Sequence, residues 1–493
     1  DRRCLVGPGT AWSYAETQER VNRIAIVLVR DFGLQPGNRV LLRAPNSPVM
    51  VAVYLAALKA GAVVVATMPM LRPRELAFMI GKARVSHAVC DARLVEDLEK
   101  ARAVSESLKH VVCFGTSAAD GLEARMAAAP ADFTPVDTAA EDVCLIGFTS
   151  GTTGRPKGTM HFHRDLLATC DTYGRHVLQP RGDDLFIGSP PIAFTFGLGG
   201  LVLFPMRVGA ASVLIEQAPP GKLIEAIETF RPTVCFTAPT AYRAMLAMLG
   251  EHDVSSLRVC VSAGEPLPRP TWDVWHERTG IRILDGIGST EMLHIFIGAP
   301  IDKVRPGSTG LPVPGYQARV IDGEGREVAP GTVGRLAVRG PTGCRYLADE
   351  RQRVYVENGW NVTGDSYVMD EDGYFWFQAR ADDMIISSGY NIAGPEVEEA
   401  LLSHPAVAEC GVVGAPDEER GQIVTAYVVL KPGHHGDAAM SKALVDHVKA
   451  EIAPYKHPRA VIFVDSLPRT QTNKLQRFVL RQWAQAHDRD KAS

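Results

Sequence analysis

The sequence lacks any pair of cysteines at the spacing of a zinc site or a redox motif, although it contains nine cysteines in 493 residues. These cysteines stand singly, mostly among apolar neighbours, and their number is odd. The pattern argues against a disulfide framework and predicts reduced core thiols in a cytoplasmic protein. The close histidine pairs His161/His163 and His434/His435 have no matching Cys or carboxylate ligands nearby, so no metal site is expected there.

The sequence also lacks a strong charge of one sign and a long apolar run. Its formal net charge is -4, with 46% hydrophobic and 22% charged residues, which is typical of a soluble globular enzyme and predicts neither nucleic-acid nor membrane binding. The most apolar stretch, residues 49–70, contains Lys59 and Gly61, so we expect a buried helix and then a strand at 62–66. Asn46-Ser47-Pro48 predicts the start of that helix. No signal peptide is visible, and we expect native N-terminal residues to be missing because the sequence opens without Met.

The length and the patterning predict more than one packing unit. Up to about residue 380, β-branched runs alternate with amphipathic helical stretches, which predicts layered α/β sheets that are largely parallel. Residues 318–339 instead read as three short strands separated by turns at Asp322-Gly323 and Pro330-Gly331, a small antiparallel unit. Residues after 380 predict a compact α+β unit. We therefore expect an N-terminal domain of residues 1–381 and a smaller, mobile C-terminal domain of residues 382–493, joined by a short polar hinge.

A string rich in glycine and hydroxyl groups follows the strand expected at residues 143–148. It reads Thr149-Ser150-Gly151-Thr152-Thr153-Gly154-Arg155-Pro156-Lys157-Gly158. Glycines let the backbone turn tightly and bring N–H groups against phosphate, while the hydroxyls and Lys157 add donors. Pro156 before the lysine, together with the spacing of the glycines, excludes a Walker P-loop. A bland surface turn would not need the whole string, which therefore favours phosphate binding.

This string is similar to the phosphate loop of the adenylate-forming superfamily of acyl-CoA synthetases, peptide-synthetase adenylation domains and luciferases. Further motifs of that family follow in order over nearly the whole chain. They are Asp285-Gly286-Ile287-Gly288-Ser289-Thr290-Glu291, Thr363-Gly364-Asp365, Arg380-Ala381-Asp382-Asp383 with Gly389, and Pro468-Arg469-Thr470-Gln471-Thr472-Asn473-Lys474. The resemblance implies an enzyme that uses ATP, Mg²⁺ and coenzyme A, with a large N-terminal domain and a mobile C-terminal one.

The resemblance also implies roles for single residues, and their chemistry agrees with it. Lys474 would stabilise the charge that develops as a carboxylate attacks the α-phosphate, Thr290 would donate to that phosphate, and Glu291 would ligate Mg²⁺. Asp382 is the expected hinge and Gly389 is expected beside the coenzyme A tunnel. The residues expected around adenine and ribose are Gly264, Glu265, Pro266, Asp285, Gly286, Ile287, Asp365, Phe377 and Arg380. The bland alternatives are a surface glutamate, an Asx turn at Asp365 and a solvated lysine.

The sequence departs from the family pattern at three positions. Ile287 stands where many relatives carry an aromatic residue that stacks on adenine, and Asn473 and Ala379 replace common glycines. None of the three removes a charged catalytic group. They therefore put the fine geometry in question, and not the activity.

Within the superfamily the chain most resembles benzoate-CoA and 2-aminobenzoate-CoA ligases, in segments 194–200, 262–268 and 285–296. A flat ring needs a slot with an aromatic wall and a glycine floor. The residues expected to form it are Phe194, Thr195, Phe196, Gly197, Gly286, Gly288, Ser289, His294 and Ile295. Thr195 and His294 are the polar groups expected to face an ortho substituent. Ordinary core packing is the alternative for the two phenylalanines and for His294.

The sequence thus predicts activation of an aromatic acid, first of all 2-aminobenzoate, to its adenylate and then to its coenzyme A thioester. A benzoate-CoA ligase, an adenylation unit that loads a carrier protein, and a non-catalytic sensor of acyl nucleotides are the alternatives. The sequence contains no Asp/Leu-Gly-Gly-x-Ser carrier site, and the presence of both Glu291 and Lys474 argues against a sensor. Ring substituents, a homodimer and the direction of the pathway stay open at this point.

Overall fold

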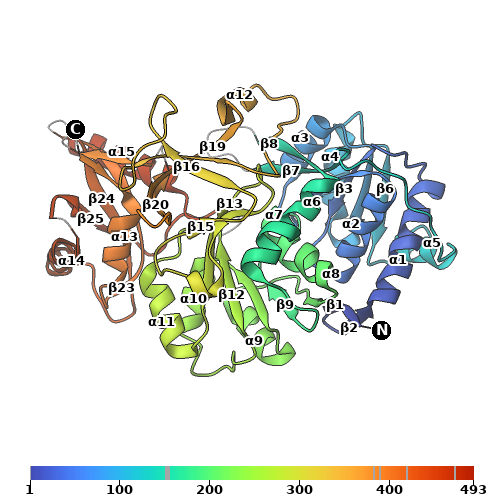
Figure 1. Cartoon of the computed structure of the whole chain (residues 1–493), viewed down its shortest axis with the longest axis horizontal. Helices are drawn as coiled ribbons and strands as arrows, with labels where there is room; N and C mark the ends of the chain where they lie inside the picture. Colours follow the sequence, from blue (N-terminus) through green and yellow to red (C-terminus); the bar gives the residue numbers. More distant parts are fainter. Residues whose placement is uncertain are drawn as a thin grey trace.

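The computed structural model describes residues 2–149, 156–380, 383–387, 390–417, 420–452, 454–470 and 474–492. These residues form a six-stranded sheet, a nine-stranded sheet and two five-stranded sheets. Amino-terminal elements (blue) and carboxy-terminal elements (orange and red) lie at opposite ends of the long axis, with β13, β15 and β16 between them (Figure 1). The predicted fold class, layered α/β sheets with a small antiparallel unit and a smaller α+β unit, is confirmed.

The six-stranded sheet has the order β6-β5-β3-β4-β7-β8 and is parallel except for β8, which pairs antiparallel with β7. Its strands are β3 (Arg39–Arg43), β4 (Val63–Thr67), β5 (His87–Asp91), β6 (His110–Phe114), β7 (Val143–Thr149) and β8 (Lys157–Phe162). Helices α1 (Tyr14–Ile26), α2 (Pro48–Lys59) and α5 (Leu122–Ala127) share a core with one face, and α3 (Pro73–Ala83) and α4 (Val95–Ala103) share a core with the other. Val40 and Leu42 of β3 face the first core and Leu41 faces the second, as expected of a strand buried on both sides.

Helix α2 confirms the expected buried helix. The Ser47 side chain accepts a hydrogen bond from the Met50 N–H, and Pro48 occupies the first turn, where its missing N–H costs nothing. The helix ends at Lys59, and β4 begins at Val63. Among the helices that the structure describes, none combines the length and the hydrophobicity needed to span a bilayer.

The nine-stranded sheet has the order β15-β14-β13-β12-β11-β9-β10-β1-β2, with antiparallel pairing at its two edges. Its strands are β1 (Arg3–Gly7), β2 (Thr10–Ser13), β9 (Leu185–Gly188), β10 (Ala211–Val213), β11 (Val234–Thr237), β12 (Val259–Ala263), β13 (Ile283–Gly288), β14 (Ile295–Gly298) and β15 (Leu311–Pro312). Strand β10 pairs parallel with β9, in a ladder that starts at Ala211 and Leu185.

Two cores cover the faces of this sheet. On one face pack α9 (Pro220–Phe230), α10 (Pro239–Leu246) and α11 (Arg269–Thr279), with Trp275 fully buried among them. On the other face lie α6 (His163–Thr169), the π-helical segment Cys170–Leu178, the short α7 (Thr195–Leu198) and α8 (Phe204–Val208). Tyr173 and Phe204 share this second core with Val338 and Phe375 of the antiparallel sheet. The antiparallel sheet is therefore fixed to the nine-stranded sheet by a common apolar core.

The antiparallel sheet has the order β16-β17-β19-β18, and β20 also pairs with β19. Its strands are β16 (Gln317–Ile321), β17 (Gly334–Arg339), β18 (Val356–Glu357), β19 (Trp360–Met369) and β20 (Phe375–Arg380), and α12 (Gln352–Tyr355) precedes β18. The prediction of a middle strand between the two turns is wrong, because this described segment forms an isolated bridge between Ile321 and Glu327 in place of a strand. Asp322 explains the difference, since its carboxylate accepts from the N–H groups of Glu324 and Arg326 and closes a tight turn.

The described elements of the C-terminal unit form one sheet with helices packed against it, as expected of an α+β unit. They are β21 (Ile385–Ser387), β22 (Tyr390–Ile392), α13 (Gly394–Leu402), β23 (Val407–Asp417), β24 (Gly421–Leu430), α14 (Ala438–Glu451), β25 (Ala460–Phe463) and α15 (Arg477–Ala492). Strand β25 pairs parallel with β24, and the other described pairings of this sheet are antiparallel. Helix α13 contacts α11 and β20, so this unit lies directly against the rest of the chain.

A buried ion pair ties the start of β9 to β12. Both carboxylate oxygens of Asp184 accept from Arg258, at 2.8 and 2.6 Å, and Oδ1 also accepts from the Thr233 hydroxyl at 2.7 Å. Burial disfavours the charged form of Asp184, but these hydrogen bonds outweigh it and lower the pKa of the carboxyl below 3.8. The pair therefore contributes stability above that pH, and the contribution is lost as the pH falls through the lowered pKa.

Asp184→Asn should lower the free energy of unfolding by about 3 kcal/mol at pH 7, the low end of the range for breaking a buried pair, because Arg258 is partly exposed. The midpoint of urea unfolding measures it, and Asp183→Asn at the exposed neighbouring position is the control. The difference should shrink below about pH 4, where the unfolded carboxyl is protonated. Equal effects of the two substitutions would contradict the account.

Candidate active site

The candidate site lies where the chain leaves the carboxyl ends of β7, β12 and β13, the edge at which α/β sheets bind ligands. Thr149 ends β7 and Lys157 begins β8, and the two residues face each other in register. Within the described residues, the buried Thr149 hydroxyl has no hydrogen-bond partner. The expected loop residues Ser150, Gly151, Thr152, Thr153 and Gly154 lie outside the described residues.

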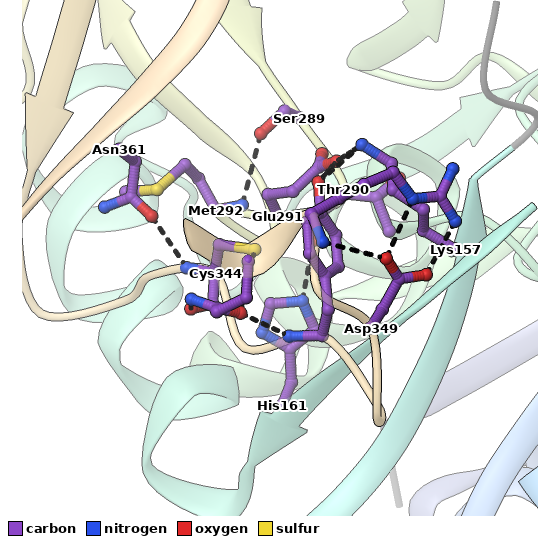
Figure 2. A network of polar contacts seen from close by, with 12 residues as sticks. Lys157, His161, Ser289, Thr290, Glu291, Met292, Cys344, Asp349 and Asn361 are labelled. Atoms are coloured by element: carbon purple, nitrogen blue, oxygen red, sulfur yellow. Dashed lines mark hydrogen bonds and ion pairs between the residues drawn. The ribbon is translucent and has the colours of Figure 1, made fainter. Parts of the chain in front are cut away.

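Lys157 and Glu291 are joined through a tyrosine that sequence reasoning missed. Lys157 Nζ donates to Tyr346 Oη at 2.7 Å, and Tyr346 Oη donates to Glu291 Oε1 at 2.6 Å. The direct distance from Lys157 Nζ to Glu291 Oε1 is 3.7 Å. Figure 2 shows Lys157 and Glu291 within one continuous polar network. Nothing in the sequence around Tyr346 points to this role, because it belongs to neither a motif nor a periodic segment.

A buried histidine holds the backbone beside Glu291. His161 on β8 makes a 2.6 Å hydrogen bond through Nε2 to the carbonyl of Thr290, and its Nδ1 lies 3.4 Å from Asp165 Oδ2. The Leu293 N–H donates to the same carbonyl, and Leu293 is buried with a φ of 69°. A left-handed leucine is uncommon, so the turn after Glu291 is held by its surroundings. His161 therefore positions the backbone next to Glu291.

The Asp285 carboxyl is enclosed on β13. Its Oδ1 atom has no hydrogen-bond partner among the residues described. Burial raises the pKa of Asp285 to about 8, and the nearby N–H groups of Gly286 and Leu267 and the Ser262 hydroxyl offset this only in part. Asp285 is therefore largely protonated at neutral pH.

The C-terminal lysine reaches this edge of the sheet. Gly264, directly after β12, has a φ of 93°, and a Cβ atom built on it would lie 3.5 Å from Lys474 Cε and 3.8 Å from Nζ. A side chain at position 264 would be strained by this φ, and its Cβ would stand in van der Waals contact with the lysine. The structure thus brings together two expected site residues that are 210 positions apart in the sequence.

Charged residues surround the approach of the C-terminal unit. Arg469 donates to Glu409 at 2.7 Å and lies 3.9 Å from Glu265, while Arg243 of α10 lies 3.6 Å from Glu409. Burial raises the pKa of Glu265, and the nearby positive charges of Arg469 and Lys474 oppose that shift. The Glu265 side chain, expected at the nucleotide, therefore faces the C-terminal unit.

The remaining residues expected at the nucleotide lie on β19 and β20 and close to the ends of β12 and β13. Asp365 on β19 pairs in register with Arg380 on β20, and Gly364 before it has a φ of 80°. The Phe377 ring packs edge-on against Tyr367 at 5.5 Å. Pro266 continues the segment after Gly264. Ile287 packs at the edge of the core that contains Tyr173 and Phe204. The Arg380 side chain, the hinge residue Asp382 and Gly389 lie outside the described residues.

His294 is enclosed by aromatic rings. Its ring centroid lies 4.7 Å from that of Phe204, 5.3 Å from Tyr173 and 5.8 Å from Phe196. Within the described structure, neither ring nitrogen has a hydrogen-bond partner. Burial lowers the pKa of His294 to about 3, so the ring is neutral at physiological pH. Aromatic rings therefore enclose His294 on several sides, and its role in the acid pocket stays a prediction beside ordinary core packing.

The other residues expected to contact the aromatic ring of the acid lie in two separate places. Phe196 faces His294 and Phe236, whereas Phe194 and Thr195 line a cavity of about 10 Å³ together with Thr290. Sequence reasoning placed Thr195 beside His294 and did not include Tyr173, Phe204 or Phe236. These three aromatics lie on elements outside the recognised motifs and could not be selected by spacing.

Close packing explains why glycine stands at three of the positions expected in the acid pocket, Gly197, Gly286 and Gly288. A Cβ on Gly286 would lie 2.7 Å from Ile295 Cγ2, and one on Gly288 would lie 2.7 Å from the His294 backbone, so either side chain would clash with the segment that pairs with β13. A Cβ on Gly197 would lie 2.2 Å from the Pro191 carbonyl oxygen. Ser289 accepts from the Met292 N–H, which closes the turn after Gly288.

The carboxylate of Glu291 suits a metal ion that arrives bound to a nucleotide. Within the described ranges, no three His, Cys, Asp or Glu side chains gather as a metal cluster. Glu291 supplies one buried carboxylate, 3.7 Å from Lys157 Nζ. Mg²⁺ is commonly held by one or two carboxylates together with substrate phosphates, so Glu291 fits that mode of binding.

Comparison with known proteins agrees with this geometry. Residues 1–346 match the AMP-binding enzyme family, and residues 396–474 match the AMP-binding enzyme C-terminal domain. The chain is 37% identical over 477 residues to benzoate–CoA ligase of Thauera aromatica, covering 96% of this chain and 90% of that protein.

Two solved structures are similar over nearly the whole chain. The anthranilate CoA ligase AuaEII in complex with anthranoyl-AMP has a TM-score of 0.95 at 35% identity, covering 99% of this chain and 95% of its own. A benzoate CoA ligase from Burkholderia xenovorans LB400 has a TM-score of 0.89 at 32% identity, covering 97% and 96%.

Asp285→Asn should stabilise the protein at pH 8 and change little near pH 4. The raised pKa means that the folded state keeps a proton that the unfolded chain releases above about pH 3.8, so wild-type stability falls as the pH rises toward about 8. The amide does not titrate and removes this loss. Urea unfolding at several pH values measures the effect, and a wild-type advantage that grows with pH would contradict it.

Proposed function

Because this chain belongs to the AMP-binding enzyme family, we propose that it activates an aromatic carboxylic acid with ATP and transfers the acyl group to coenzyme A. AMP and pyrophosphate would be released. The observation that carries the proposal is the position of Lys474, whose ammonium group meets Gly264 at the edge of the sheet that also holds Glu291. We further propose residues 1–381 as the domain that binds ATP and the acid, and residues 382–493 as the mobile domain.

In the first step, a carboxylate oxygen of the acid would attack the α-phosphorus, and the bond to pyrophosphate would break. Lys474 would stabilise the negative charge that develops between the carboxylate and the α-phosphate, and Thr290 would donate to the same phosphate. Mg²⁺ held by Glu291 would neutralise phosphate charge when it is bound. Thr149, Lys157 and the loop between them would hold the phosphates, while Asp365 and Arg380 would hold the ribose.

In the second step, the C-terminal domain would turn about Asp382, and Gly389 would line the path of the thiol. The coenzyme A sulfur would attack the acyl carbonyl as a thiolate and AMP would leave with the bonding electrons. A carboxylate is a poor electrophile, so the adenylate is what makes thioester formation feasible. The nine free cysteines suit a reducing compartment, and we place the enzyme in the cytoplasm.

We propose 2-aminobenzoate as the acid, with benzoate as the second candidate. The similar anthranilate ligase was solved with anthranoyl-AMP, and the similar Thauera protein is a benzoate ligase. In this chain, His294 is neutral and aromatic rings surround it, so a nitrogen of its ring would accept a hydrogen bond from an aryl amine. Benzoate would leave that acceptor unused.

Lys474→Ala should slow adenylation by at least ~10²-fold, the scale for losing one group that stabilises transition-state charge. Thioester formation from pre-made acyl adenylate should fall much less, because Lys474 leaves the site when the domain turns. Pyrophosphate exchange and single-turnover thioester formation separate the two steps. Lys449→Ala, at an exposed position of α14, is the control. Equal losses in both half-reactions would overturn the assignment of Lys474.

The preference for 2-aminobenzoate over benzoate should be about 2- to 13-fold in kcat/KM, the effect of one neutral hydrogen bond of about 0.5–1.5 kcal/mol. His294→Leu should abolish this preference while keeping benzoate activity, because leucine fills the space without an acceptor. AMP formation with benzoate, 2-aminobenzoate, 4-hydroxybenzoate and hexanoate decides it. If 4-hydroxybenzoate or hexanoate is preferred, the pocket is assigned wrongly, although adenylation itself would stand.

A further inference from the structure

The Lys157 ammonium group lies next to Glu291 and would compete with a metal ion for the Glu291 carboxylate. A carboxylate that ligates a metal must not be neutralised by a direct lysine ion pair, yet Lys157 Nζ lies only 3.7 Å from Glu291 Oε1. Both side chains are largely shielded from water, where such a pair is strong. The Tyr346 hydroxyl bridges the two groups from one side, 2.7 Å from the nitrogen and 2.6 Å from the oxygen.

The backbone holds Tyr346 in this position. The Leu347 N–H donates to the Gly158 carbonyl and the Met160 N–H donates to the Arg345 carbonyl, both at 2.8 Å, so the segment forms a bridge with β8. The Tyr346 N–H also donates to Gln352 Oε1 at 2.7 Å. Tyr346 is 5% exposed, so its hydroxyl has little freedom to turn elsewhere.

The direction of the hydrogen bonds follows from the charges. A carboxylate oxygen can only accept and an ammonium group can only donate, so the Tyr346 hydroxyl donates its proton to Glu291. Its lone pairs accept from Lys157. The Lys157 ammonium also lies 4.5 Å from the centroid of the Tyr346 ring, which holds the lysine against the ring face.

We propose that Tyr346 is a positioning residue that keeps the Glu291 carboxylate oriented and available for the metal ion of a metal–nucleotide complex. The inference rests on the proposed function, in which Glu291 ligates Mg²⁺. When the triphosphate arrives, Lys157 would turn to the phosphates while Tyr346 keeps its hydrogen bond to Glu291. Without the hydroxyl, Lys157 and Glu291 would close into a direct ion pair that competes with the metal.

Tyr346→Phe should therefore weaken metal binding by about 10- to 100-fold, the usual effect of removing a partner that orients a metal ligand. The probe is Mn²⁺, titrated by electron paramagnetic resonance in the presence of saturating α,β-methylene-ATP, which cannot be adenylated. Turnover should recover toward the wild-type value at high Mg²⁺.

Tyr355→Phe is the matched control. Its ring packs 5.8 Å from that of Tyr346, and its hydroxyl has no hydrogen-bond partner in the described part of the chain. The control should leave Mn²⁺ affinity unchanged. Equal weakening by both substitutions would show a general packing effect and overturn the proposal, as would an unchanged affinity in Tyr346→Phe.

A double substitution tests the competition itself. In a Lys157→Met background no ion pair can form, so removing the Tyr346 hydroxyl should weaken Mn²⁺ binding less than it does in the wild type. If the loss of the hydroxyl weakened Mn²⁺ binding equally in both backgrounds, Tyr346 would not act by limiting the competition from Lys157. Mn²⁺ binding needs no acid, so a wild type that forms no AMP with any aryl acid would refute the proposed function while this test still reported on Tyr346.

Discussion

The hydrogen-bonded chain from Lys157 through Tyr346 to Glu291 joins three parts of the fold at one point. Lys157 begins β8 of the six-stranded sheet, Glu291 follows β13 of the nine-stranded sheet, and Tyr346 comes from the segment that leads into the antiparallel sheet. A buried carboxylate is costly unless it is hydrogen-bonded, so the three parts must keep this spacing. Lys157, expected at the phosphates, and Glu291, the expected metal ligand, consequently lie close together.

The C-terminal unit completes this site from outside. Lys474 reaches Gly264, while Arg469 and Arg243 both lie against Glu409, so charged side chains of both units meet at the contact. Polar contacts between partly exposed residues are individually weak, which suits the domain movement that we propose. The observed arrangement, with the lysine at the edge of the sheet, is the one that adenylation would need.

Local sequence determined much of the fold, because caps, breakers and β-branched runs act over a few residues. Ser47 and Pro48 start α2 as expected, and Asp322 closes a turn so tight that the expected middle strand shrinks to one bridge. The motifs named Glu291 and Lys474 because their types and order recur in a family. Tyr346 escaped prediction because it contacts Glu291 across 55 positions, through a pairing between β8 and an irregular segment.

The path of one oxygen atom tests the proposed chemistry most directly. If the carboxylate attacks the α-phosphorus, an aryl acid labelled with ¹⁸O in its carboxyl group must leave one labelled oxygen on AMP after coenzyme A has taken the acyl group. Mass spectrometry of the AMP formed in a single turnover with labelled 2-aminobenzoate or benzoate measures this transfer. The account predicts AMP with one ¹⁸O atom, whereas AMP without label, or label in pyrophosphate, would contradict it.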